Sequence, residues 1–337
     1  MKNVLVTGGA GFIGSNFINH ILDNSDDVFI VNLDKLTYAG NLENLKVSQN
    51  NKRYKFIKGD ICNYELVENI FSDYKIKYVI NFAAESHVDR SILGSQVFYH
   101  TNVIGTNVVL ELSRRFEVER FLQVSTDEVY GSLGATGLFT ESTPISPNSP
   151  YSSSKAAADM MVSAFYHTYG MPVLITRCSN NYGPLQFPEK LIPLMIINAL
   201  NDKPLPVYGD GMNVRDWIYV LDHNIAIQTV LEKGTPGNVY NVGAKTEKPN
   251  IEIVKLILNY LNKSEDLIKY VSDRPGHDKR YAIDNTKIET ELGWQPSFKF
   301  EDAIGKTIDW YLANKSWWEK IISGEYRNYY DTQYGKR

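Results

Sequence analysis

The segment VLVTGGAGFIGSN near the N-terminus constrains the fold more than any other feature of the chain. The apolar run at 4–7 is followed at once by Gly8, Gly11 and Gly14, and then by a helix-like pattern. Glycines let the backbone turn tightly from a strand into a helix and approach a ligand closely, and the first N–H groups of that helix can bind a pyrophosphate. The segment therefore predicts a dinucleotide-binding strand–turn–helix unit.

Short apolar runs alternate with longer amphipathic segments through the first half of the chain. The apolar runs predict strands at 4–7, 28–34, 54–60, 78–84, 120–126 and 172–177. Helical patterns lie between them, for example at 14–23 and 102–115. Strands that are almost wholly apolar are typical of a parallel sheet covered on both faces. The alternation predicts an α/β fold with a Rossmann-type, doubly wound parallel sheet.

The composition of the sequence changes after residue 178, where proline and glycine become frequent. Helical patterns such as LIPLMIINAL persist there. We expect a dinucleotide-binding domain at 1–178, with a return segment around 209–235. Residues 179–337 should form mainly a smaller, mixed α/β lobe whose loops bind the substrate. The aromatic run WYLANKSWWEKIISGEYRNYY near the C-terminus is expected to pack against the body of the protein.

Composition excludes several classes of partner. A net charge of −4 gives no electrostatic reason to expect nucleic acid or an anionic membrane surface. No apolar stretch is long enough for a transmembrane helix, and the N-terminus has no signal-peptide pattern. The two cysteines, Cys62 and Cys178, have no metal-type spacing and predict neither a metal site nor a disulfide framework. We expect a cytoplasmic protein.

Acidic residues at the ends of two predicted strands suggest how the dinucleotide is chosen. Asp34 lies twenty residues after Gly14, where a carboxylate would accept hydrogen bonds from the adenosine ribose and repel a 2′-phosphate. This favours NAD over NADP, although the neighbouring Lys35 weakens the preference. Asp60 could meet the adenine amino group, with Ile61 against the ring. The alternative is that Asp34 and Asp60 cap helices.

Tyr151 and Lys155 form a Y-x-x-x-K pair that follows Ser149 and Pro150, a plausible helix start. The spacing puts both side chains on one helix face. Ionising a tyrosine at neutral pH costs roughly 4 kcal/mol, and one positive charge about 5 Å away supplies about 3 kcal/mol. Lys155 and an oxidised nicotinamide together could therefore make Tyr151 a general base.

The fifth predicted strand ends in Ser125-Thr126-Asp127-Glu128. Ligands of open α/β sheets bind beyond the carboxyl ends of the strands, so these side chains are placed to act on a substrate. Two adjacent carboxylates could also be solvated turn residues or a helix cap, and the pair alone does not choose between these roles.

Several motifs together carry a resemblance to a known family. GGAGFIGSN, LDKLTYAGNL, NFAAESHVDRS, STDEVYG, SPYSSSKAA, CSNNYGP, EKLIP, RDWIYVLDH and DRPGHDKRYAID resemble the dTDP-glucose 4,6-dehydratases, which are extended short-chain dehydrogenase/reductases. The resemblance covers almost the whole chain. It implies a lyase that converts dTDP-glucose into dTDP-4-keto-6-deoxyglucose and water, a step that serves rhamnose and other deoxysugar pathways. It also implies a homodimer formed through a helical bundle.

The same resemblance assigns catalytic roles to Thr126, Asp127, Glu128, Tyr151 and Lys155. Tyr151 would take the proton of the C4 hydroxyl, which Thr126 helps to position, while C4 gives a hydride to NAD. The new ketone acidifies the C5 hydrogen, which Glu128 would remove, and a protonated Asp127 would donate to the departing C6 hydroxyl. One carboxyl must be an acid while its neighbour is a base, and placing the two together pushes their pKa values apart.

The resemblance also implies two sets of binding residues. Cofactor contacts are expected from Gly8, Gly11, Phe12, Ile13, Gly14, Asp34, Lys35, Leu36, Thr37, Asp60, Ile61, Phe82, Ala83, Ala84, Ser86, Thr101, Tyr151, Lys155 and Asn180. Nucleotide-sugar contacts are expected from Ser86, Thr126, Asn181, Lys190, Leu191, Pro206, Val207, Tyr208, Arg215, Asn250, Asp273, Arg274, Pro275, Gly276 and His277. Arg215 and Arg274 suit the diphosphate because a guanidinium offers forked donors. A structural ion pair, for Arg215 near Asp216, is the alternative.

Three other functions stay open. A 4,6-dehydratase acting on another nucleoside-diphosphate hexose would share every motif. A 4-epimerase shares the glycine turn and the Tyr151–Lys155 pair but needs no acid and base at C5 and C6, so the Asp127–Glu128 pair disfavours it. A non-catalytic NAD-binding scaffold or sensor could use the same fold.

Overall fold

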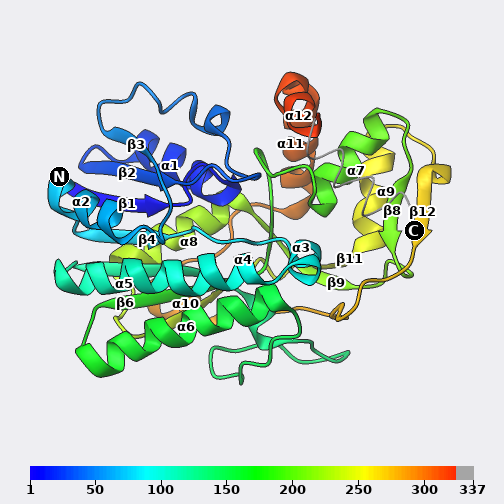
Figure 1. The fold of residues 1–337 in the computed structure, drawn as a ribbon. Coiled ribbons are helices and arrows are strands. Elements are labelled where there is room, and N and C mark those ends of the chain that lie inside the picture. Colours follow the sequence, from blue (N-terminus) through cyan, green and yellow to red (C-terminus); the bar gives the residue numbers. More distant parts are fainter. Residues whose placement is uncertain (324–337) are drawn as a thin grey trace.

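The large unit of the protein is a seven-stranded parallel sheet. The structure is a computed structural model that describes residues 1–323, and Figure 1 shows its arrangement. The strands run in the order β10-β6-β5-β4-β1-β2-β3, and every neighbouring pair is parallel. Their bounds are β1 (Lys2–Thr7), β2 (Val28–Asp34), β3 (Tyr54–Lys58), β4 (Tyr78–Asn81), β5 (Arg120–Thr126), β6 (Val173–Cys178) and β10 (Val239–Val242).

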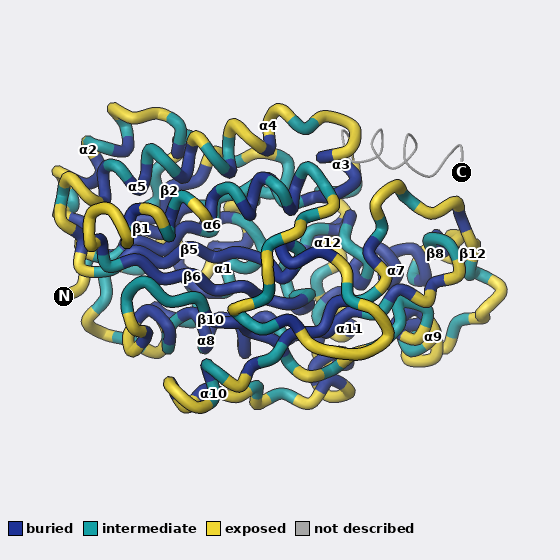
Figure 2. Tube along the Cα trace, turned by 90° about the horizontal axis from the view of Figure 1, so that it is seen from below, coloured by how far each residue is buried: buried dark blue, intermediate teal, exposed yellow. Residues whose placement is uncertain are grey.

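Helices cover both faces of this sheet, as the apolar strands require. One face carries α1 (Phe12–Asn24), α8 (Val220–Lys233) and α10 (Thr286–Leu292), and the other carries α2 (Tyr64–Tyr74), α5 (Thr106–Arg115) and α6 (Pro150–Tyr169). Side chains alternate between the two cores along each strand. In β1, Val4 and Val6 pack with α1, and Leu5 packs with α5 on the opposite face. Figure 2 shows β5 and β6, in the middle of the sheet, buried over most of their length.

A smaller lobe follows, with its own core. It contains α7 (Leu191–Leu200), α9 (Asn250–Tyr260), α11 (Phe300–Ala313) and α12 (Lys315–Ile322). Two small sheets complete it. One is the parallel pair β8 (Leu205–Tyr208) and β12 (Ile268–Val271), and the other joins β11 (Glu247–Pro249), β9 (Val214–Tyr219) and β7 (Asn180–Tyr182). Between these elements the chain returns to the large sheet, because α8 packs on α1 and β10 pairs with β6.

The predicted fold class is confirmed, with local differences. The seventh strand, β10, was not predicted. The fourth strand ends at Asn81 rather than 84, because the Thr7 hydroxyl accepts the Ala83 N–H (3.2 Å) where the chain turns over the glycine segment. The helix expected at 102–115 begins as a π-helical segment, η2 (His100–Gly105). The part of the aromatic run from residue 324 onward lies outside the described residues.

Within residues 1–323, no helix is both long enough and apolar enough to cross a bilayer.

Candidate active site

The glycine turn after β1 has a shape that only glycine permits. Gly8 has φ +69°, and a Cβ there would lie 2.6 Å from the Ala83 backbone nitrogen. A Cβ on Gly14 would lie 2.6 Å from the carbonyl oxygen of Gly8. Gly11 caps α1 without any side-chain hydrogen bond, so the first N–H groups of the helix face the cavity beside the turn. This cradle fits the pyrophosphate of a dinucleotide.

Asp34 is buried at the end of β2, where its carboxylate supports the turn. One carboxylate oxygen accepts the Ala10 N–H at 2.8 Å and the other accepts the Leu36 N–H at 2.7 Å. Burial raises the pKa of Asp34, and the two N–H groups lower it. Each oxygen keeps a further lone pair that can accept a ribose hydroxyl. The helix-capping alternative does not hold, because Asn41 and Asn63 cap the helices that follow β2 and β3.

Lys35 is paired with Asp60 across the adenine end of the cavity. Its ammonium lies 2.7 Å from one oxygen of Asp60, and the other oxygen accepts the Cys62 N–H at 2.9 Å. Burial raises the pKa of Asp60, but the hydrogen bond from Lys35 and that N–H leave it below its ordinary value. Lys35 is thus already held by a carboxylate, which removes the main reason to expect a 2′-phosphate.

A cavity of about 290 Å³ runs from the glycine turn to the end of β5. Every expected cofactor residue lines it except Leu36, whose side chain packs against the core on the α1 face. Four of the expected substrate residues also line it: Ser86, Thr126, Asn181 and Lys190. The other eleven do not line it and belong to the small lobe and its loops: Leu191, Pro206, Val207, Tyr208, Arg215, Asn250, Asp273, Arg274, Pro275, Gly276 and His277.

Tyr151 and Lys155 lie in the first turns of α6, which starts as predicted with a Ser149–Ser152 capping box and Pro150 at its first position. Lys155 Nζ donates to the Val124 carbonyl at 2.8 Å. Burial raises the pKa of Tyr151 well above its ordinary value, and the nearby Glu128 raises it further. The protein groups around Tyr151 therefore favour its neutral form.

The surroundings of Asp127 favour its protonated form. It begins the short helix η3 (Asp127–Tyr130) beyond β5, and its side chain is deeply buried. Burial raises the pKa of Asp127 well above its ordinary value, and the negative charges of Glu128 and Asp216 add to the effect. A carboxyl that holds its proton at neutral pH can act as a general acid.

Glu128, the next residue, differs from Asp127 in having three cationic neighbours. The Thr126 hydroxyl accepts its N–H at 3.2 Å and fixes the turn. Burial raises the pKa of Glu128 above its ordinary value, and three neighbouring cations reduce this rise: Arg274, Lys190 and Arg215. The two adjacent carboxyls therefore have different protonation tendencies, with Glu128 the group that ionises first and Asp127 the group that keeps its proton.

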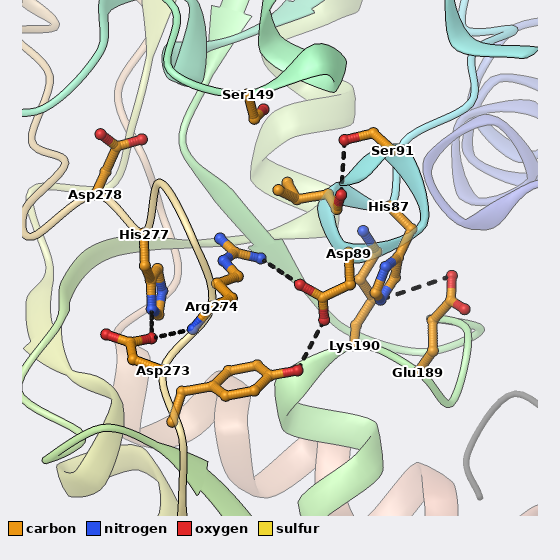
Figure 3. A network of polar contacts seen from close by, with 12 residues as sticks. His87, Asp89, Ser91, Ser149, Glu189, Lys190, Asp273, Arg274, His277 and Asp278 are labelled. Carbon is orange, nitrogen blue, oxygen red and sulfur yellow. Dashed lines mark hydrogen bonds and ion pairs between the residues drawn. The ribbon is translucent and has the colours of Figure 1, made fainter. Parts of the chain in front are cut away.

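A polar network joins α3 (Val88–Leu93) to the loop at 273–277 (Figure 3). Asp89 accepts a hydrogen bond from the Arg274 guanidinium at 3.3 Å and another from the Tyr208 hydroxyl at 2.9 Å. His277 lies 2.6 Å from Asp273, and burial is the main reason that the pKa of His277 falls to about 4. The network holds two expected substrate residues, Arg274 and Tyr208, against the large unit.

Arg215 is not in an ion pair with Asp216. Its guanidinium donates to the carbonyls of Val214 (2.8 Å) and Asp278 (2.9 Å) and lies over the Tyr281 ring, 4.3 Å from the centroid. The Asp216 carboxylate instead accepts backbone N–H groups, from Ala244 and Thr246. Its hydrogen-bond partners are uncharged carbonyls, and its positive charge acts on the nearby carboxyls of Glu128 and Asp127.

Comparison with known proteins decides the family. The model of the GDP-mannose 4,6 dehydratase family matches residues 5–307. A dTDP-glucose 4,6-dehydratase of Xanthomonas campestris is 54% identical over 345 residues, covering 97% of this chain and 98% of the relative. The chain belongs to the dTDP-glucose 4,6-dehydratase family. This confirms the resemblance that the motifs carry.

Solved structures agree with this assignment. The dTDP-glucose 4,6-dehydratase of Bacillus anthracis, crystallised in complex with NAD, has a TM-score of 0.90 and 52% identity over 95% of this chain and 100% of its own. A UDP-glucose 4-epimerase of Thermotoga maritima is more distant, with a TM-score of 0.87 and 30% identity over 93% of this chain and 99% of its own. The backbone is thus shared with epimerases, and the sequence is closer to the dehydratase.

Sequence reasoning missed several residues at this site. Glu189 is deeply buried, lies 2.9 Å from Arg90 and faces the neutral His87, whose pKa is well below its ordinary value mainly because of burial. Arg90 also lies over the Tyr38 ring, 3.9 Å from the centroid. The only sequence signal was their place in motifs of the family: YAGN, SHVDRS and EKLIP.

Proposed function

We propose that this protein removes water from dTDP-glucose to give dTDP-4-keto-6-deoxyglucose, with NAD as a cofactor that is restored in each turnover. The observation that carries the proposal is the pair of adjacent carboxyls at the end of β5. Burial and two negative charges raise the pKa of Asp127 well above its ordinary value, whereas at Glu128 three cations oppose the rise that burial causes. An elimination needs an acid and a base at neighbouring carbons, and this pair supplies both.

Bound NAD supplies the hydride acceptor for C4 and the hydride donor for C6. Tyr151 takes the proton of the C4 hydroxyl, and the Thr126 hydroxyl, which hydrogen-bonds to Tyr151, helps to hold that substrate group. Glu128 then removes the C5 proton, and Asp127 gives its proton to the departing C6 hydroxyl. Glu128 finally returns its proton to C5. Tyr151 then holds the proton of the C4 hydroxyl and Asp127 lacks one, so transfer of one proton from Tyr151 to Asp127 restores both for the next turnover.

The diphosphate is assigned to the cationic side of the small lobe. Arg215 and Arg274 are both largely buried, and the Nε of Arg274 has no hydrogen-bond partner within residues 1–323. A buried guanidinium with spare donors is a favourable site for a phosphate. We accordingly propose that 1–178 together with the returning segment binds NAD and that the rest of 179–337 binds the nucleotide sugar.

We also propose a homodimer and a cytoplasmic location. Apolar side chains are exposed on the face formed by α3, α4 (Gln96–Tyr99), η2 and α6, beside α5 in Figure 1: Ile92, Leu93, Val97, Ile104 and Met160. Such a patch suits a helix-to-helix interface between two copies. Free Cys62 and Cys178 fit a reducing compartment. A light-scattering mass that corresponds only to the monomer would contradict the proposed homodimer.

The direct test is incubation of the purified protein with dTDP-glucose, with UDP-, CDP- and GDP-hexoses in parallel. The proposal predicts a new C6 methyl signal in the proton spectrum with dTDP-glucose. A galactose-configured product without a methyl signal would mean a 4-epimerase, and turnover of another nucleotide only would overturn the base assignment. If NAD binds but none of these substrates reacts, the scaffold alternative is correct.

A further inference from the structure

The helices α11 and α12 pack into the core of the small lobe, and their polar groups also contact segments outside that core. In Figure 1, α11 and α12 lie between the large sheet and the lobe that carries α7 and α9. An aromatic cluster forms their corner, with the Trp310 and Trp317 rings 5.0 Å apart and the Tyr311 and Trp317 rings 6.3 Å apart. Polar groups of this corner reach both sides of the cofactor cavity.

The first polar contact leads to the glycine turn. The Trp317 indole N–H donates to the Asn44 side-chain oxygen at 2.9 Å, and the Asn44 side-chain nitrogen donates to the Ala10 carbonyl at 3.0 Å. An indole N–H can only donate and a carbonyl can only accept, so these two partners fix the orientation of the amide. Asn44 is buried in η1 (Leu42–Leu45), between α12 and the turn.

Ala10, within the glycine turn, is held from both ends. Its N–H donates to Asp34, the expected ribose ligand, at 2.8 Å, and its carbonyl accepts from Asn44. Asn44 is itself fixed to the helix that begins at the turn, because the Asn19 side chain of α1 donates to the Asn44 carbonyl at 3.1 Å. A movement of α12 would therefore displace the peptide groups that are expected to face the pyrophosphate.

The second polar contact leads to the opposite wall of the cavity. The Tyr311 hydroxyl, which is fully buried in α11, donates to the Gln186 carbonyl at 2.5 Å. Gln186 lines the cavity, and its side chain donates to the Asn181 carbonyl at 2.8 Å. The corner between α11 and α12 thus makes polar contacts toward two walls of the cavity, at the glycine turn through Asn44 and at Gln186.

We propose that the Trp317–Asn44 contact controls how long NAD stays bound, which makes Trp317 and Asn44 positioning residues for the glycine turn. The proposal rests on NAD as the cofactor of the proposed function. Retention is useful here because the cofactor is restored in each turnover and need not leave. Loss of the contact should loosen the turn and speed the release of NAD, whatever the rate of the chemical steps.

The test measures release of NAD from the purified holoprotein, by chasing bound NAD with excess deuterated NAD and following the exchange by mass spectrometry. Trp317→Phe removes the N–H and keeps an aromatic ring, and we expect release to be about three- to tenfold faster, the effect of one buried hydrogen bond. Trp310→Phe is the matched control, because it alters the same aromatic cluster without touching Asn44, and its release should match the parent.

A double-mutant cycle separates this contact from general packing. Asn44→Leu keeps the side-chain size and removes both hydrogen bonds, so it should release NAD at least as fast as Trp317→Phe, and adding Trp317→Phe to it should cause no further increase. The proposal would be overturned if Trp317→Phe released NAD at the parent rate, or if Trp310→Phe accelerated release as much as Trp317→Phe. It would also be overturned if the two substitutions had additive effects on the release rate in the cycle, or if the parent bound no NAD. A parent that retains NAD but does not convert dTDP-glucose would refute the proposed function alone.

Discussion

Replacing Asp127 with asparagine should stop the elimination while sparing the oxidation at C4. Burial and the neighbouring charges of Glu128 and Asp216 raise the pKa of Asp127 and so favour its protonated form. Asparagine is close in shape to that neutral carboxyl, so the substitution removes no charge and should leave Glu128 and its cations undisturbed. It removes only the proton that must pass to the C6 hydroxyl.

The size of the rate loss follows from the role of Asp127 as general acid. A positioned general acid contributes about 10²–10⁴ in rate, which corresponds to roughly 2.7–5.4 kcal/mol of the barrier. Tyr151, Lys155 and the cofactor cradle are unchanged in the variant, so hydride transfer from C4 should continue. Reduced NAD should therefore accumulate on the enzyme, while the product appears 10²- to 10⁴-fold more slowly than in the parent.

The assay is single-turnover mixing of the Asp127→Asn holoprotein with dTDP-glucose, with reduced NAD followed by absorbance and the C6 methyl group by proton NMR. Thr126→Val is a useful comparison, because it should slow the oxidation itself by displacing the C4 hydroxyl. Our reasoning would be refuted if Asp127→Asn formed product within about threefold of the parent rate, or if oxidation and elimination were lost to the same extent.

Three further predictions concern pH, stability and cofactor binding. The profile of kcat against pH should be bell-shaped, falling on the acid side as Glu128 is protonated and on the alkaline side as Asp127 loses the proton that its raised pKa retains; a rate that rises with pH throughout would contradict this. Asp159→Asn should lower the free energy of unfolding by about 3–5 kcal/mol in urea titrations, because it breaks the buried ion pair with Arg177 (2.9 Å); a loss below about 1 kcal/mol would show that the pair is dispensable. Gly14→Ala should abolish NAD binding in calorimetry, because its Cβ would lie 2.6 Å from the carbonyl oxygen of the first glycine of the turn; parental affinity would contradict the steric argument.

The sequence predicted those parts of the protein whose causes are local. Strand period and apolar content placed six strands of the large sheet, and Ser149 with Pro150 placed the start of α6. The strand β10 was not predicted because it has only four residues and pairs with β6, more than 60 residues earlier in the chain. Such pairing depends on tertiary structure, which a local pattern does not report.

At the site, too, the sequence predicted the features with local causes and missed the contacts between distant residues. The glycine turn and the residue types at the end of β5 were readable, because their chemistry needs those residues at those spacings. The links from Asn44 to Trp317 and from Asp89 to Arg274 join residues 273 and 185 positions apart, so no spacing rule could find them. The direction of Lys155 toward the Val124 carbonyl was equally invisible, since a helical face does not fix where a long side chain ends.

The central claim is that Glu128 removes the C5 proton while Asp127 protonates the leaving hydroxyl. The most direct measurement is conversion of dTDP-glucose in heavy water, followed by proton NMR, for the parent and for Glu128→Gln. We predict that the parent product carries a C6 methyl group and deuterium at C5, and that Glu128→Gln still reduces bound NAD but forms no methyl group. A methyl-bearing product with hydrogen retained at C5, or a Glu128→Gln variant that forms product at the parent rate, would contradict the account.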